Sequence, residues 1–241
     1  MSKEDSPWAS GPREILRHGV ELLKKDSDTN RRLAMISIDN AVELTVKTFL
    51  GLPKRVTGLP ISRKEFQEIS ESFPAMLDAL EKYAADKLTG IDLGEIEWYH
   101  RLRNQLYHQG NGLTVERTKV EIYAQLANTL FENLFGMKLV QKVSESTELF
   151  GEFMTAWRDF EATLNGRFPD LDAHRSVTIM EMMRKLSDSG ILSNHELNDI
   201  ENLRRVRNSM AHARPSPTPL TPELIQRLDA YVKRIRKHPG K

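Results

Sequence analysis

The stretch Ile96–His108 has the sequence IEWYHRLRNQLYH, and 104 positions later the stretch Ile200–His212 repeats it as IENLRRVRNSMAH. Both copies follow the pattern I-E-x-x-x-R-[L/V]-R-N-x-x-x-H. A repeated core would preserve the apolar positions and let Arg, Asn and His vary, so the shared polar residues indicate a shared chemical task. In a chain of 241 residues, an offset of this size favours two domains of roughly 100 residues each.

Helical patterns dominate on both sides of the repeat, and no segment shows the sustained alternation of a strand. The predicted helices span about 13–25, 31–50, 63–87 with an interruption near Pro74, 92–108, 114–135, 145–168, 173–189 and 193–212, and a last helix opens at Thr221-Pro222-Glu223. A loop rich in Gly and Pro is expected over 53–60. The sequence therefore predicts an all-α fold.

Two of these helices carry specific signals. Asn30 is the predicted cap of the helix over 31–50, in which Leu33, Ile36, Asn40, Val42 and Leu44 stand at roughly helical spacing. Ser193 and Glu196 form the pattern of a capping box, in which each side chain bonds the other residue's backbone amide. Because the second half repeats the last four elements of the first, we expect two four-helix units, the first with an extra N-terminal helix. The polar stretch 137–147 is the predicted boundary.

Composition restricts the chemistry. The chain has no cysteine, which excludes disulfides, thiolate metal sites and cysteine nucleophiles. The sequence shows neither a secretory signal nor an apolar span, so a soluble, cytoplasmic protein without membrane contact is expected. The formal net charge is only +1, but residues 201–241 carry ten Lys/Arg against three acids. This asymmetry fits a polyanion-binding surface, and it equally fits a solvated basic helix and tail.

The repeated polar residues suit cleavage of an RNA phosphodiester without a metal. Residues four apart on a helix share a face, so Asn104 lies beside His108 and Asn208 beside His212. One imidazole would activate the ribose 2′-OH and the other would protonate the leaving 5′-oxygen. The preceding arginines would stabilise charge on the phosphoryl oxygens. One copy makes a poor site, whereas two copies across a pseudo-two-fold axis supply both histidines.

The motif R-N-x-x-x-H near the end of a helix resembles the HEPN superfamily, whose members carry an Arg and a His separated by four to six residues. The resemblance implies two tandem four-helix, up-down HEPN domains, 1–138 and 145–241, that form a pseudo-two-fold pair within one chain or a homodimer. It also implies a metal-independent endoribonuclease without cofactors, in a defence or toxin-like system, with RNA as substrate and an antitoxin or regulatory protein as a possible partner. The implied catalytic residues are Arg103, Asn104, His108, Arg207, Asn208 and His212. Arg101, Arg204, Arg205 and Arg214 are candidate RNA-binding residues.

Structural interpretations of the same residues stay open. Arg103 and Arg207 could pair instead with a buried carboxylate on an earlier helix, such as Glu43 or Glu161. The pairs Glu97–Arg101 and Glu201–Arg205 have the spacing of helix-surface ion pairs. His100, His174 and His195 are most simply surface residues, and no H-E-x-x-H metal spacing is present. Arg13 and His18 also stand at the motif spacing without the Asn, which we interpret as chance. The second functional class is a non-catalytic HEPN-like module that binds a nucleotide or a protein.

Overall fold

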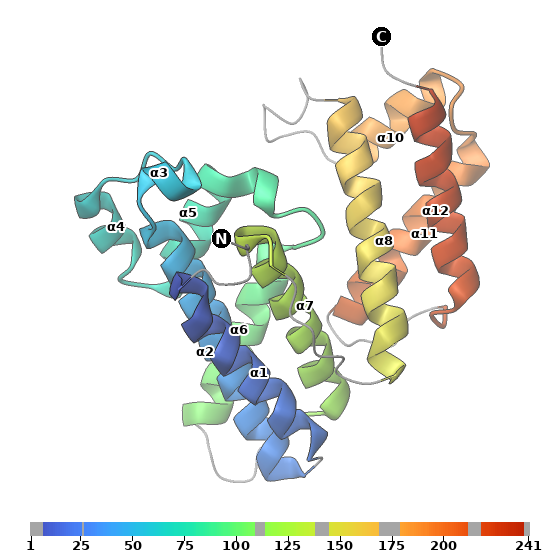
Figure 1. Cartoon of the computed structure of the whole chain (residues 1–241). Helices are drawn as coiled ribbons and strands as arrows, with labels where there is room; N and C mark the ends of the chain where they lie inside the picture. The colour runs from blue at the N-terminus through green and yellow to red at the C-terminus, as the bar shows by residue number, and fades with distance from the viewer. Residues whose placement is uncertain are drawn as a thin grey trace. The chain divides into compact units, whose positions relative to one another are not determined.

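The computed structural model describes residues 7–25, 27–108, 114–137, 145–168, 179–211 and 218–238, and every regular element in these ranges is a helix (Figure 1). At His108, at residues 145–148 and at Ala211 the description covers the backbone alone. The all-α prediction is confirmed for these ranges. The chain divides into two compact units, Met1–Thr147 and Glu148–Lys241.

The first unit is built around one central helix. Its helices are α1 (Ser10–Lys24), α2 (Asp28–Gly51), α3 (Lys54–Thr57), α4 (Arg63–Ile69), α5 (Phe73–Ala84), α6 (Leu93–His108) and α7 (Arg117–Phe135), with 3₁₀ turns η2 (Pro7–Ala9) and η3 (Ala85–Lys87). Helix α2 packs against α1, α5, α6 and α7, and Figure 1 shows α1 lying along it. Any polar side chain on the inner faces of α2 is therefore enclosed by neighbouring helices.

Helix α2 begins earlier and faces differently than predicted. Ser27 is its cap, because the Ser27 hydroxyl accepts a hydrogen bond from the Asn30 amide at 3.2 Å. The predicted apolar stripe is only partly right: Val42 is buried and Ile36 and Leu44 are half-buried, but Leu33 and Asn40 are exposed. The other buried side chains are Ala34, Met35, Ile38, Asp39, Ala41, Thr45, Val46, Phe49 and Leu50. Helix α2 has neighbouring helices on several sides, so its buried residues occupy more than one face. The 3.6-residue periodicity of its apolar residues is therefore weak in the sequence.

The segment between α2 and α5 contains more helix than expected. The predicted loop over 53–60 includes the four-residue helix α3, which Pro53 precedes and Gly58 ends with a left-handed φ of 79°. The predicted interruption near Pro74 is confirmed. Helix α4 ends at Ile69, and α5 begins with Ser72 as its cap and Pro74 in its first turn.

The second unit contains four helices within the described ranges: α8 (Glu145–Arg167), α10 (Ile179–Asp188), α11 (Asn194–Ala211) and α12 (Pro222–Lys237). All four contribute to one apolar core, which includes Trp157, Met183, Leu203 and Leu228. The first part of the predicted helix over 173–189 lies outside the described residues. No helix in the described part of the chain is long and apolar enough to cross a bilayer.

The predicted capping box of α11 is confirmed in both directions. The Ser193 amide donates to Glu196 Oε2 at 2.9 Å, and the Glu196 amide donates to Ser193 Oγ at 3.3 Å. The hydrogen bonds from Ser193 and the charge of Arg234 hold the pKa of Glu196 below its usual value, against a smaller raising effect of burial. The cap fixes the start of the helix whose last turns carry Arg207 and Asn208 of the second motif.

Candidate functional site

The first motif arginine is held inside its own unit. Arg103 Nε donates to Asp39 Oδ2 at 2.6 Å, and Arg103 Nη2 lies 3.3 Å from Glu43 Oε2. The same nitrogen lies 3.3 Å from Asn40 Oδ1 on α2, and Nη1 donates to Asn104 Oδ1 at 2.9 Å. The predicted alternative, pairing with Glu43, is thus confirmed for Arg103. The more buried partner is Asp39, because its side chain is 0% exposed while that of Glu43 is 41% exposed.

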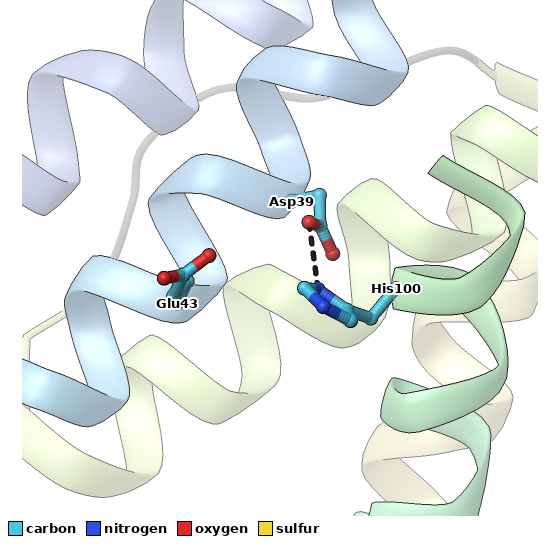
Figure 2. A group of neighbouring side chains, drawn as sticks. All are labelled: Asp39, Glu43 and His100. Atoms are coloured by element: carbon cyan, nitrogen blue, oxygen red, sulfur yellow. Dashed lines mark hydrogen bonds and ion pairs between the residues drawn. The ribbon is translucent and has the colours of Figure 1, made fainter. Parts of the chain in front are cut away.

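Asp39 is the centre of this polar network. Its Oδ1 accepts a hydrogen bond from Tyr123 on α7 at 2.7 Å, and its Oδ2 lies 3.0 Å from His100 Nδ1 on α6 (Figure 2). Burial by itself raises the pKa of Asp39. The hydrogen bonds from His100 and Tyr123 and the charges of His100 and Arg103 outweigh burial and lower it. Asp39 is therefore an ionised carboxylate that ties α2, α6 and α7 together.

Tyr123 bonds Asp39 Oδ1, whereas His100 and Arg103 contact Oδ2. Its ring stacks on that of Tyr99, with centroids 4.4 Å apart and planes inclined by 9°. Burial, followed by the charge of Asp39 and the hydrogen bond to it, raises the pKa of Tyr123 well above its usual value. The phenol thus stays protonated and remains a donor to Asp39.

The prediction that His100 is a surface residue is wrong. Its side chain is 14% exposed, and its ring packs against Phe73 with centroids 4.4 Å apart. His100 lies four residues after the buried Ile96 and three before Arg103, so helical spacing turns it toward α2. This spacing is the sequence signal that identifies His100 as an inward-facing residue. His195 is exposed as expected, and His174 lies outside the described residues.

Sequence reasoning missed Asp39 and Tyr123. Asp39 follows Met35 and precedes Val42 at four- and three-residue spacing, so it occupies a core position of the helix. A carboxylate at such a position needs a buried partner. That signal was present in the sequence. Tyr123 is 84 residues away, and nothing local in the sequence links it to Asp39.

The second motif repeats one detail of the first. Arg207 is 4% exposed, and its Nη1 donates to Asn208 Oδ1 at 3.3 Å, as Arg103 does to Asn104. Arginine has only donors, so the amide atom that faces it must be the oxygen. The amide nitrogen of each asparagine is consequently turned away from the arginine. For Glu161, the predicted partner of Arg207, the structure gives a hydrogen bond from Trp157 Nε1 at 2.6 Å. The Arg207–Glu161 pair stays a prediction.

The motif histidines lie at the limit of the described structure. His108 is the last residue of α6, where only the backbone is described, and His212 and Arg214 lie outside the described residues. The two motifs belong to different units. The predicted facing pair of histidines therefore stays a prediction.

The three candidate RNA-binding arginines within the described residues, Arg101, Arg204 and Arg205, form ion pairs on their own helices. Arg101 Nη2 lies 2.7 Å from Glu97 Oε1, which confirms that predicted pair. Arg204 bonds both oxygens of Glu201, at 2.8 and 2.9 Å, and Arg205 Nε lies 3.5 Å from the same carboxylate. The hydrogen bond from Arg204 and the charges of Arg204 and Arg205 lower the pKa of Glu201. Burial acts in the opposite direction, but the net effect is a lowered pKa. These arginines remain partly or largely exposed.

The excess of basic residues after position 200 is partly balanced within the second unit. On α12, Arg227 pairs with Asp199, Arg234 with Glu196 and Arg236 with Asp159. All three acids precede residue 201, so the charge count for 201–241 alone overstates the local positive field. The interpretation as a solvated helix gains weight from these pairs.

Comparison of the chain with protein-family models, with curated proteins and with solved structures finds no match. The resemblance to the HEPN superfamily thus rests on the motif residues themselves.

Proposed function

We propose that the chain is a metal-independent endoribonuclease of HEPN type, with one composite site formed by its two R-N-x-x-x-H motifs. The observation that carries the proposal is the arginine–asparagine hydrogen bond, which occurs in both copies at the same position of the motif helix. Because the amide oxygen accepts this bond, the amide nitrogen of each asparagine is turned away from the arginine, and each asparagine precedes the motif histidine by four residues in the sequence. A repeat that only preserved apolar core positions would not need this arginine–asparagine hydrogen bond.

In this proposal, the histidines and asparagines act on the RNA directly. One of His108 and His212 takes the proton of the ribose 2′-OH, and the other gives a proton to the leaving 5′-oxygen. The amide groups of Asn104 and Asn208 donate to the phosphoryl oxygens or hold the imidazoles. Cleavage leaves a 2′,3′-cyclic phosphate and a 5′-hydroxyl, because the 2′-oxygen is the nucleophile.

The arginines take a different role from the one the sequence suggests. Arg103 contacts two carboxylates, those of Asp39 and Glu43, which offset its charge. Such a guanidinium is poorly suited to bind phosphate, and it is well suited to orient Asn104. We therefore assign Arg103 as a positioning residue. We give Arg207 the same role because it is 4% exposed and makes the same bond to Asn208. The remaining elements of the proposal are tandem domains 1–138 and 145–241, pairing within one chain or between two, and regulation by an antitoxin-like protein.

A non-catalytic module is the second candidate. The same contacts of Arg103 with Asp39 and Glu43 favour it, because they give the first motif a structural task that needs no chemistry. Such a module would bind a nucleotide or a protein through the exposed end of the motif helix and would cleave nothing.

Cleavage of a generic RNA in EDTA separates the two candidates. We expect cleavage by the wild type, and a rate lower by about 10²- to 10⁴-fold for His108→Ala and for His212→Ala. His18→Ala is the matched control, because His18 also follows an arginine by five residues and is exposed. If the protein binds RNA but cleaves none in any form, the binding module is the correct function.

A further inference from the structure

Three side chains of the first unit form a group with the composition of a metal site. Asp39 and Glu43 lie four residues apart on α2 and so share a face, and His100 faces them from α6 (Figure 2). One oxygen of each carboxylate and one ring nitrogen of His100 all lie within 4.8 Å of one another. The group is therefore more than an acidic patch, because it combines an imidazole with two carboxylates from two packed helices.

These ligand types suit a divalent transition metal. Zn²⁺ and its neighbours in the series bind imidazole nitrogen and carboxylate oxygen at about 2.0 to 2.2 Å, which places two ligand atoms of one ion roughly 3 to 4 Å apart. The 3.0 Å between Asp39 Oδ2 and His100 Nδ1 already meets this requirement. Glu43 has the more exposed side chain, so it can make the remaining approach by rotation about its own bonds.

The two carboxylates of the group already bind a cation of the protein itself, the guanidinium of Arg103. Arg103 Nε contacts Asp39 Oδ2, and Arg103 Nη2 contacts Glu43 Oε2. With the His100 imidazole in the neutral form that a metal ligand requires, two carboxylates against one guanidinium leave a formal charge of −1, so a dication in place of the guanidinium would neutralise the pair. The same charge argument makes simultaneous occupancy by both cations unfavourable.

We propose that Asp39, Glu43 and His100 bind a divalent transition-metal ion such as Zn²⁺, in competition with the guanidinium of Arg103. Binding releases Arg103 from α2 and disturbs its hydrogen bond to Asn104. His100 lies eight residues before His108 on α6, about 12 Å along the helix axis. The metal site is thus separate from the proposed catalytic His108 on the same helix, and its existence does not depend on RNA cleavage.

Calorimetric titration of the EDTA-stripped, full-length protein with Zn²⁺ tests the proposal, and Co²⁺ absorption reports nitrogen coordination. We expect one ion per chain with a dissociation constant below about 100 µM. Loss of even an outer-shell partner weakens metal sites about 10- to 100-fold, so Glu43→Gln and His100→Ala are expected to weaken binding by at least about 10-fold. His195→Ala is the matched control, because it removes an exposed histidine of the second unit.

Arg103→Gln gives the distinguishing readout, because removal of the competing cation should tighten Zn²⁺ binding by at least about fivefold. A purely structural role for Arg103 would not produce this gain. If His100→Ala does not fold, Glu43→Gln still tests the site, because Glu43 is partly exposed and its replacement should leave the fold intact. Circular dichroism checks that the Glu43→Gln variant is folded. The proposal is overturned by wild-type protein that binds no Zn²⁺ at 100 µM free ion, by unchanged binding in Glu43→Gln, or by weaker binding in Arg103→Gln.

Discussion

Replacement of Asp39 by alanine should destabilise the first unit severely. The substitution removes the acceptor of three donors, on Tyr123, His100 and Arg103. The Tyr123 hydroxyl is fully buried and would lose its partner, at a cost of about 1–3 kcal/mol. Arg103 keeps Glu43 and Asn104, and its side chain is 16% exposed, so water replaces part of what it loses. The combined loss is expected near the range for a broken buried ion pair, about 3–5 kcal/mol.

Urea unfolding combined with hydrogen exchange by mass spectrometry measures this loss for each unit separately. Peptides from α2 and α6 should exchange faster in Asp39→Ala, whereas peptides from α11 should keep their wild-type rates, because the two units have separate cores. Asp86→Ala is the control, since the Asp86 side chain is 73% exposed and its removal should cost less than about 0.5 kcal/mol. A loss below about 1 kcal/mol for Asp39→Ala would refute the central place given to this carboxylate.

The same substitution should change the response to acid. The pKa of Asp39 is lowered from 3.8 in the folded state. The carboxylate therefore contributes its full stability above the unfolded pKa of 3.8, and this contribution is lost as the pH falls through the lower folded value. The stability difference between wild type and Asp39→Ala should not shrink between neutral pH and about 4, and it should shrink below that pH. A stability difference that shrinks between pH 7 and 5 would contradict a lowered pKa of Asp39 in the folded state.

Two further predictions concern helix packing and capping. Gly19→Ala should destabilise the first unit by about 1–3 kcal/mol, because the new Cβ would lie 2.8 Å from Ile38 Cγ1. Gly166→Ala, where nothing lies within 4 Å, should instead stabilise α8 by about 0.5–1 kcal/mol in urea unfolding. Ser193→Ala should cost the second unit about 1 kcal/mol through loss of the capping box, whereas the exposed Asn202→Ala should stay within about 0.5 kcal/mol in thermal unfolding.

Local features of the fold were predictable because their causes are local. Ser193 and Glu196 are three residues apart and satisfy each other's amides, so the pattern alone predicts the cap. Pro74 marks the break in the helical stretch over 63–87 for a similarly local reason, since proline lacks the amide hydrogen needed inside a helix and is tolerated in its first turn. The all-helical class follows from the same periodic signals.

The face of α2 and the partners of the motif were not predictable in the same way. Helix α2 has neighbours on several sides, so its apolar residues do not mark one stripe, and the predicted phase placed Asn40 inward instead of Asp39. The contact between Asp39 and Tyr123 joins residues 84 positions apart, which only the packing of α7 on α2 brings together. Pairing of Arg103 with α2 was foreseen through Glu43, because that carboxylate lies on the helix expected to pack against the motif.

The two motifs together are proposed to cleave RNA through the 2′-oxygen. The most direct measurement is the initial rate of cleavage, in EDTA, of an RNA and of its 2′-deoxy counterpart by the wild type, His108→Ala and His212→Ala. We expect cyclic-phosphate products from the RNA with wild-type protein, no cleavage of the deoxy substrate, and loss of activity in both variants. Undiminished cleavage by either variant, or equal cleavage of the deoxy substrate, would contradict the claim.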